Sequence, residues 1–285
     1  MGEEYETSYS KIEEVEAEIF EWHKGVFLKE RLLFAEMLEL ILESFKPLEG
    51  YRKDTDECEL ALATLATRMF NDAEGAKQLL LWGLPAQAKP MTRDIIECML
   101  LFRLFLRKPK TGKKWLMSLT EYQPGDVNAK LVELGVHAKE YAWYGLLSHE
   151  GHSNLLASLS HTQEMNVGER GMLRQFHFGS ARTPETERFI QWGFLPLFFL
   201  LYVALNEPLA EFYYRRSESE VFSEWCAKVN DLKPKLLDLF SEIADKPASG
   251  TSKVDHPLLE LIEKKLRLKD FERILTGDSD LPLKE

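Results

Sequence analysis

The spacing of apolar residues is the feature that most constrains this fold, because it follows the period of an α-helix through nearly the whole chain. No stretch alternates apolar and polar residues for long enough to indicate a β-strand. Prolines and glycines interrupt the pattern at intervals, which divides it into several helices. The sequence therefore predicts an all-α fold, a multi-helix bundle with a long N-terminal helix and an apolar central helix.

The expected helices follow from where the pattern starts and stops. The first covers residues 11–45 and is ended by Pro47 and Gly50. The second begins near 54–56, where aspartates can cap backbone amides, and ends at Gly83. The third covers 86–107 and is ended by Pro109 and Gly112. Further helices are predicted at 113–122, 127–134, 137–149, 185–216 and 218–245, the last broken or kinked at Pro234, and residues 162–184 form a long loop or a short hairpin.

The same pattern predicts the domain organisation. Residues 1–245 form one helical domain, of which residues 1–10 are too polar and acidic to pack and are expected to be disordered. Residues 246–254 have the composition of a linker. Residues 255–285 contain a final amphipathic helix that packs on the bundle or on a partner subunit.

Composition limits the partners and the compartment. The net charge of -11 argues against a broad basic face for duplex DNA, although it permits a local basic pocket. Three cysteines at long spacings form neither a disulfide framework nor a zinc motif. The N-terminus has no signal-peptide pattern, so we expect a cytoplasmic protein. The apolar run Trp192–Leu205 is about 14 residues long, whereas spanning a membrane needs about 20, so we expect a core helix and no membrane partner.

Two charged pairs stand out within the helical stretches. In the third helix Arg93 and Glu97 are spaced i,i+4 on an arc with leucines, which predicts a partly buried ion pair. The other arc of this helix is expected to face solvent; it comprises Thr92, Ile96, Arg103 and Arg107. In the second helix Arg68 and Asp72 have the same spacing, and they become part of one site if they face Arg93 and Glu97 across the turn at Gly83.

A polar stripe on the predicted helix after residue 137 completes the candidate site. Tyr144, Ser148 and His152 lie on one face, and such groups are buried only when they are hydrogen-bonded. The hypothesis places a cleft between the helices, with His152, Ser148 and Glu97 as candidate catalytic residues. Arg93, Tyr144, Arg68 and Asp72 are the candidate ligand-binding residues. The alternative is a polar network that only joins packed helices.

Metal and cofactor sites are not expected. His149, Glu150 and His152 are close in sequence, but their spacing differs from the His-Glu-x-x-His pattern of helical zinc sites. No glycine-rich loop for a nucleotide or dinucleotide phosphate is present.

Two resemblances bear on function. Residues Ala66–Leu106, followed by Tyr144-x3-Ser148-x3-His152, resemble an uncharacterised bacterial family of helical proteins that carries an Arg-x-x-x-Glu and a Tyr…Ser…His motif. That resemblance implies a helical fold without a settled activity. The chain is similar, more distantly, to HEPN-type domains, which implies a ribonuclease or a nucleotide-binding partner in bacterial defence. The HEPN pair of arginine and histidine has its spacing here in Arg170 and His177, in a polar segment.

Three functions remain open at this point. The first is a binding or accessory protein whose cleft recognises a small anionic or nucleotide-like ligand through Arg93, with a homodimer as one arrangement. The second is a hydrolase or metal-independent ribonuclease that uses His152 as general acid and base. The third is a structural or interaction protein with no pocket.

Overall fold

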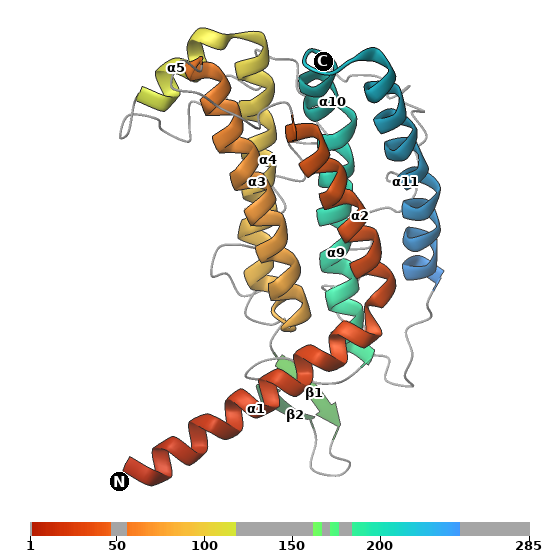
Figure 1. Ribbon diagram of the computed structural model, residues 1–285. Coiled ribbons are helices and arrows are strands. Elements are labelled where there is room, and N and C mark those ends of the chain that lie inside the picture. The colour runs from red at the N-terminus through yellow and green to blue at the C-terminus, as the bar shows by residue number, and fades with distance from the viewer. Residues whose placement is uncertain (1, 47–55, 118–161, 167–171, 177–183, 246–285) are drawn as a thin grey trace, which may run out of the picture. The chain divides into compact units, whose positions relative to one another are not determined.

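The computed structural model describes residues 2–46, 56–117, 162–166, 172–176 and 184–245. This part of the chain is helical apart from one β-hairpin, which confirms the all-α fold class (Figure 1). The chain divides into two compact units, Met1–Val229 and Asn230–Glu285, and the boundary falls within a helix. The predicted helices at 127–134 and 137–149, the linker 246–254 and the final helix after 255 lie outside the described residues.

The predicted first helix is two helices, α1 (Gly2–Val26) and α2 (Leu28–Phe45). Helix α1 begins at Gly2, so it includes most of the segment that was expected to be disordered. The chain bends at Phe27, which is fully buried and packs its ring against Phe194 at a centroid distance of 6.0 Å. Gly25 lowers helix propensity just before this point. The bend therefore turns an aromatic ring into the core.

Helices α3 (Glu57–Leu81) and α4 (Pro85–Arg107) form the predicted hairpin. Asp56 caps α3 by accepting a hydrogen bond from the Cys58 amide at 3.1 Å. Gly83 makes the turn with a φ of 72°, a conformation that favours glycine. The predicted core stripe of α3 is buried along its length: Leu62, Leu65, Met69, Ala73, Ala76 and Leu80.

The predicted solvent-facing arc of α4 is wrong, because α3, α5, α9 and α10 surround this helix. Thr92, Ile96 and Arg103 are buried, and only Arg107 is exposed. The buried polar groups on this arc have partners, one within α4 and one at the junction of α9 and α10. The Thr92 hydroxyl donates to the Ala88 carbonyl, and Arg103 forms an ion pair with Glu207.

Two short elements follow α4. Helix α5 (Pro109–Met117) begins at Pro109, the residue that was expected to end α4, and it overlaps the start of the predicted helix at 113–122. Proline suits the first turn of a helix because the amide it lacks has no intrahelical partner there. Strands β1 (Thr162–Asn166) and β2 (Met172–Phe176) pair antiparallel, with Thr162 opposite Phe176. The hairpin option for this segment is therefore confirmed.

The predicted apolar central helix is α9 (Pro184–Asn206), which contacts α2, α3, α4 and α10. The polar continuation is a separate helix, α10 (Pro208–Tyr214), because Pro208 cannot donate a backbone hydrogen bond to the preceding turn. By length and composition alone, Ile190–Tyr214 could cross a membrane, but 78% of its most apolar window is buried inside the protein. The prediction of a core helix is confirmed.

Helix α11 (Ser219–Asp245) continues through Pro234, so the predicted break there is wrong. Its N-terminal part is joined to α2: the Trp225 indole N–H donates to the Leu40 carbonyl at 3.0 Å, and Lys228 pairs with Glu43 at 3.0 Å. Helix α2 thus lies between α3 and the start of α11 (Figure 1).

Candidate functional site

The two predicted charged pairs are parts of one network between α3 and α4. Arg93 Nε lies 3.6 Å from Glu97 Oε1, and Arg68 Nε lies 3.6 Å from Asp72 Oδ2. Asp94 joins them, since its two carboxylate oxygens lie 2.8 Å from Arg68 Nη2 and 3.5 Å from Arg93 Nη2. The predicted pairs are therefore present and face one another across the hairpin.

The network contains two arginines and three carboxylates, so it carries no excess positive charge. Burial raises the pKa of the Asp72 carboxyl above its usual value, although Arg68 opposes that shift. Each arginine is held between carboxylates in a fixed arrangement. This arrangement can fix the register of α3 on α4, but it is a poor receptor for an anion.

The remaining predicted site residues lie outside the described part of the chain. These are Tyr144, Ser148 and His152, together with the HEPN-like pair Arg170 and His177. The structure therefore brings together Arg68, Asp72, Arg93 and Glu97, and it leaves the proposed cleft with His152 as a prediction. Among the residues it describes, no group of three or more His, Cys, Asp or Glu is placed to hold a metal ion.

Sequence reasoning missed Asp94, although a signal existed. In an antiparallel hairpin, residues equally far from the turn lie level with each other, and Asp72 and Asp94 are equally far from Gly83. The same rule places Cys98 level with Arg68. Burial raises the pKa of the Cys98 thiol to about 12.

We expect Cys98 and Cys58 to be inert towards thiol reagents in the native protein. Both are buried, and with a pKa of about 12 only about one Cys98 thiol in ten thousand is ionised at pH 8. Cys226 is only partly buried and should react first. Labelling with a chromogenic disulfide should titrate one thiol in buffer and three in denaturant. The variant Cys226→Ser should lose the native signal, and rapid native labelling of Cys98 would contradict the packing described here.

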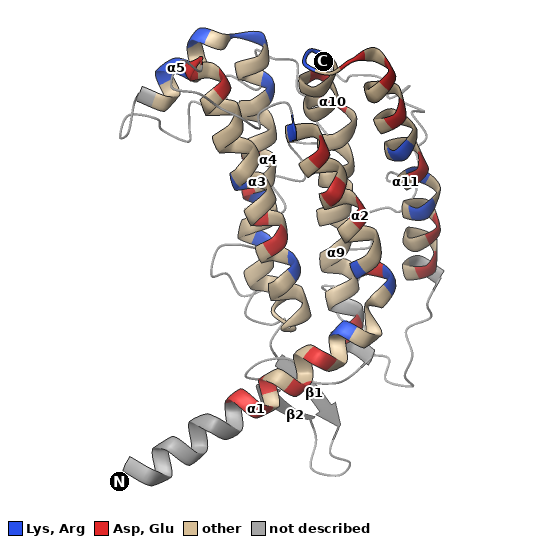
Figure 2. Cartoon of the chain, viewed as in Figure 1, with Lys and Arg blue, Asp and Glu red and all other residues tan. Residues whose placement is uncertain are grey.

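A second polar feature lies at the end of α4, where five basic residues occur within the sequence RKPKTGKK. We call this set the basic tip; it comprises Arg107, Lys108, Lys110, Lys113 and Lys114. All five are exposed. Figure 2 shows their positive charge gathered where α4 turns into α5, in a chain whose net charge is -11.

The inner face of α5 explains why its lysines point outward. Gly112 is buried, and a Cβ on it would lie 3.1 Å from both Cys58 Sγ and Phe105 Cγ. Trp115 packs on Phe105 at a ring-centroid distance of 5.5 Å. On the outer side Lys113 pairs with Glu57 at 2.7 Å, and this hydrogen bond raises the pKa of Lys113.

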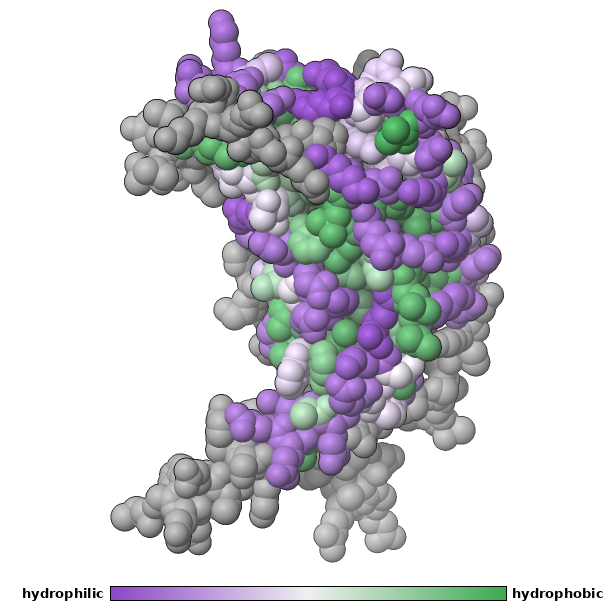
Figure 3. Space-filling model, in the orientation of Figure 1, coloured by the Kyte–Doolittle hydropathy of each residue, from purple (hydrophilic) through white to green (hydrophobic). Residues whose placement is uncertain are grey.

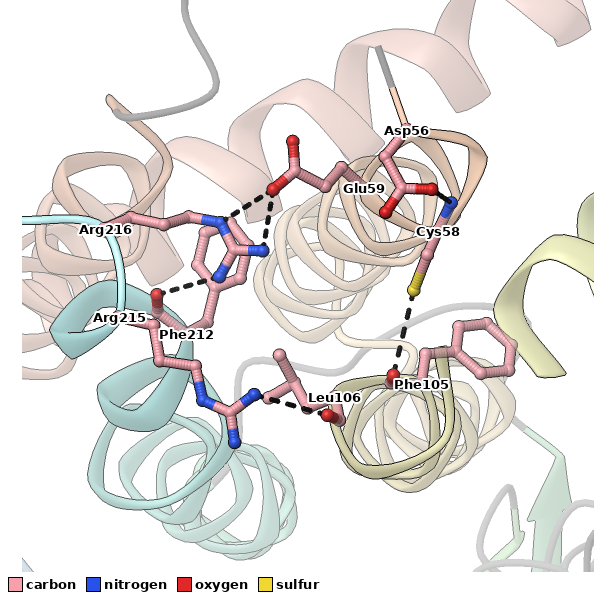
Figure 4. A network of polar contacts seen from close by, with 8 residues as sticks. All are labelled: Asp56, Cys58, Glu59, Phe105, Leu106, Phe212, Arg215 and Arg216. Atoms are coloured by element: carbon pink, nitrogen blue, oxygen red, sulfur yellow. Dashed lines mark hydrogen bonds and ion pairs between the residues drawn. The ribbon is translucent and has the colours of Figure 1, made fainter. Parts of the chain in front are cut away.

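Side chains from α3 and from the two residues after α10 contact the same end of the bundle (Figure 4). Arg216 binds Glu59 at 2.9 Å and lies over the Phe212 ring, 4.2 Å from its centroid. Arg215 donates to the Leu106 carbonyl at 3.3 Å, and the Cys58 thiol contacts the Phe105 carbonyl at 3.7 Å. Two carbonyls at the end of α4, those of Phe105 and Leu106, therefore have side-chain partners from other segments.

Comparisons of this chain with protein-family models, with curated proteins and with solved structures find no significant match.

Proposed function

We propose that this protein binds a small phosphate-bearing anion at the basic tip. The ligand class is the one expected from the sequence, a small anionic or nucleotide-like molecule, but the site moves from Arg93 to the junction of α4 and α5. The observation that carries the proposal is the exposure of five cationic side chains, Arg107 to Lys114, on a braced end of an acidic protein.

The position of the lysines in α5 is better explained by a bound anion than by a favourable interaction with a helix dipole. Basic residues at the C-terminus of α4, such as Arg107, interact favourably with its dipole. Lys110 stands instead in the first turn of α5, where acidic residues are preferred and α5 has none. A bound phosphate would offset this unfavourable placement, because helix N-termini and lysines both attract anions.

The size of the basic tip favours a small ligand over a duplex. Helix α5 has nine residues and therefore extends over roughly 14 Å, enough for a few phosphate groups. The surrounding chain is strongly acidic, which opposes the approach of a long polyanion. A nucleoside triphosphate and inorganic tripolyphosphate both present a chain of three phosphates. Comparing them shows whether a nucleoside adds to the binding.

The first test is thermal unfolding of the full-length protein with ATP, tripolyphosphate and inorganic phosphate. A ligand present at a hundred times its Kd stabilises the native state by about 2.7 kcal/mol. For a chain of this size that corresponds to a rise in Tm of about 5–10 °C. Tripolyphosphate and ATP should both raise Tm more than phosphate does, and added salt should reduce the effect because the site is exposed.

Two double variants that remove the same charge distinguish binding at the basic tip from a general effect of net charge. Lys110→Gln with Lys114→Gln should abolish the rise in Tm, whereas Lys233→Gln with Lys235→Gln removes the same charge from α11 and should preserve it. If both double variants lose the rise in Tm equally, the anions respond to the net charge of the protein and not to the basic tip. No rise in Tm with any of the three anions in wild-type protein would refute the proposal.

A further inference from the structure

The outer face of α2 carries an exposed apolar stripe. We call it the outer stripe; its residues follow one another at spacings of four and three: Leu28, Leu32, Ala35, Glu39, Leu42 and Lys46. Its three leucines are 52%, 59% and 51% exposed, respectively. The opposite face of α2, including Leu33, Phe34 and Met37, is buried in the core.

Apolar residues on both faces of a helix are typical of a helix that is buried on both sides. Figure 3 shows hydrophobic surface over α2 and along its boundary with α3. There an open groove of about 610 Å³ lies beside the stripe. Its apolar lining comes from Leu42 and Phe45 of α2 and Ala63 and Ala66 of α3, and its polar lining from Glu39, Glu43, Lys46 and Thr67. Exposed apolar residues that are grouped together and rimmed by polar ones are typical of an interaction site.

We propose that a second copy of this chain covers the outer stripe, with the two α2 helices packed antiparallel about a two-fold axis. Alternating spacings of four and three are the pattern by which two helices interlock side chains along a shared seam. In this register Leu32 lies opposite the partner's Leu42, and by symmetry Leu42 lies opposite the partner's Leu32. Ala35 lies opposite the partner's Glu39.

Charge on the flanks of the stripe favours the same arrangement. Lys29 is exposed on one flank, and the antiparallel register places it next to the partner's Glu43, twice in the dimer. Glu43 already pairs with Lys228 at 3.0 Å, so the partner's lysine would add a second cation to that carboxylate. A parallel pairing would instead set Glu39 against its own copy. The small side chain of Ala35 leaves Glu39 room to reach water.

This inference is independent of the phosphate site, since the outer stripe and the basic tip share no residue. Sedimentation of the full-length protein over micromolar to submillimolar concentrations should show a monomer–dimer equilibrium. Leu32→Glu should raise the dissociation constant about a hundredfold or more, because each substitution appears twice in a two-fold interface. Val221→Glu alters a residue on α11 that is 41% exposed and should leave the equilibrium unchanged.

Cysteine cross-linking tests the register. A Leu32→Cys variant mixed with a Leu42→Cys variant should give a disulfide-linked dimer under mild oxidation, and neither variant alone should do so efficiently. Two results would each overturn the proposal: a wild-type monomer at every concentration, or a dimer that Leu32→Glu does not weaken. Efficient cross-linking by Leu32→Cys alone would replace the antiparallel register with a parallel one and equally contradict it.

Discussion

Substituting Phe198→Ala should lower the free energy of unfolding by about 3–5 kcal/mol, the largest effect expected from a single side chain here. Phe198 is fully buried in α9. It stacks on Phe194 at a centroid distance of 5.6 Å and contacts Phe34 of α2 at 6.4 Å. Removing its ring leaves a cavity between two helices that meet across the core, and neither can collapse into it without losing other contacts.

Denaturant unfolding monitored by circular dichroism measures this effect. Thermal unfolding followed by the same signal should show a fall in Tm of about 5–8 °C for a chain of this length. Tyr214→Ala is a suitable control, because Tyr214 is an aromatic residue at 64% exposure and its loss should cost less than about 0.5 kcal/mol. Equal losses from the two variants would mean that α9 is not the core helix of this fold.

The two places where predicted helices divide show why sequence periodicity locates helices better than their ends. The apolar period continues through Phe27, and the bend there arises because the ring packs on Phe194, a residue far along the chain. At Pro208 a local signal did exist, since proline cannot continue the backbone ladder. At Pro234 the same signal failed, because α11 runs through it. A proline weakens a helix, but tertiary contacts decide whether the helix ends.

The candidate site, too, could be predicted from the sequence only in part. The i,i+4 pairs Arg68–Asp72 and Arg93–Glu97 follow from helix geometry, so they could be predicted. The role of Asp94 depends on how α3 lies on α4, which required the turn at Gly83 to be placed. The solvent-facing assignment of Arg103 is wrong because α3, α5, α9 and α10 surround α4, and helix periodicity alone does not show which arcs have neighbours. Its partner Glu207 comes from a distant break between helices, which periodicity does not locate.

The basic tip was overlooked for a related reason. Pro109 and Gly112 were interpreted as signals that end α4, whereas both have positive roles in α5. Pro109 starts the helix, and Gly112 allows it to lie against Phe105 and Cys58. The lysines of α5 share its outer face. The segment that resembles a helix terminus in the sequence therefore forms a positively charged surface.

The substitution Gly112→Val should therefore affect both stability and phosphate binding. Its Cβ would lie 3.1 Å from two buried groups, Cys58 Sγ and Phe105 Cγ, and valine adds two further methyl groups at this tight position. Overpacking of this kind costs about 1–3 kcal/mol. We expect α5 to be displaced from α3 and α4 together with Lys110 and Lys114, and the rise in Tm with tripolyphosphate should be lost.

Two comparisons separate these effects. Gly25→Ala adds a methyl group where nothing lies within 4 Å, in the last turn of α1, and it should raise stability by up to about 1 kcal/mol. Gly112→Ala should be intermediate, because a single methyl group requires its neighbours to move only slightly. If Gly112→Val unfolds at the wild-type temperature, α5 does not pack as described. If it is destabilised yet binds tripolyphosphate normally, the packing stands and the phosphate site must lie elsewhere, because the basic tip depends on the position that Gly112 gives to α5.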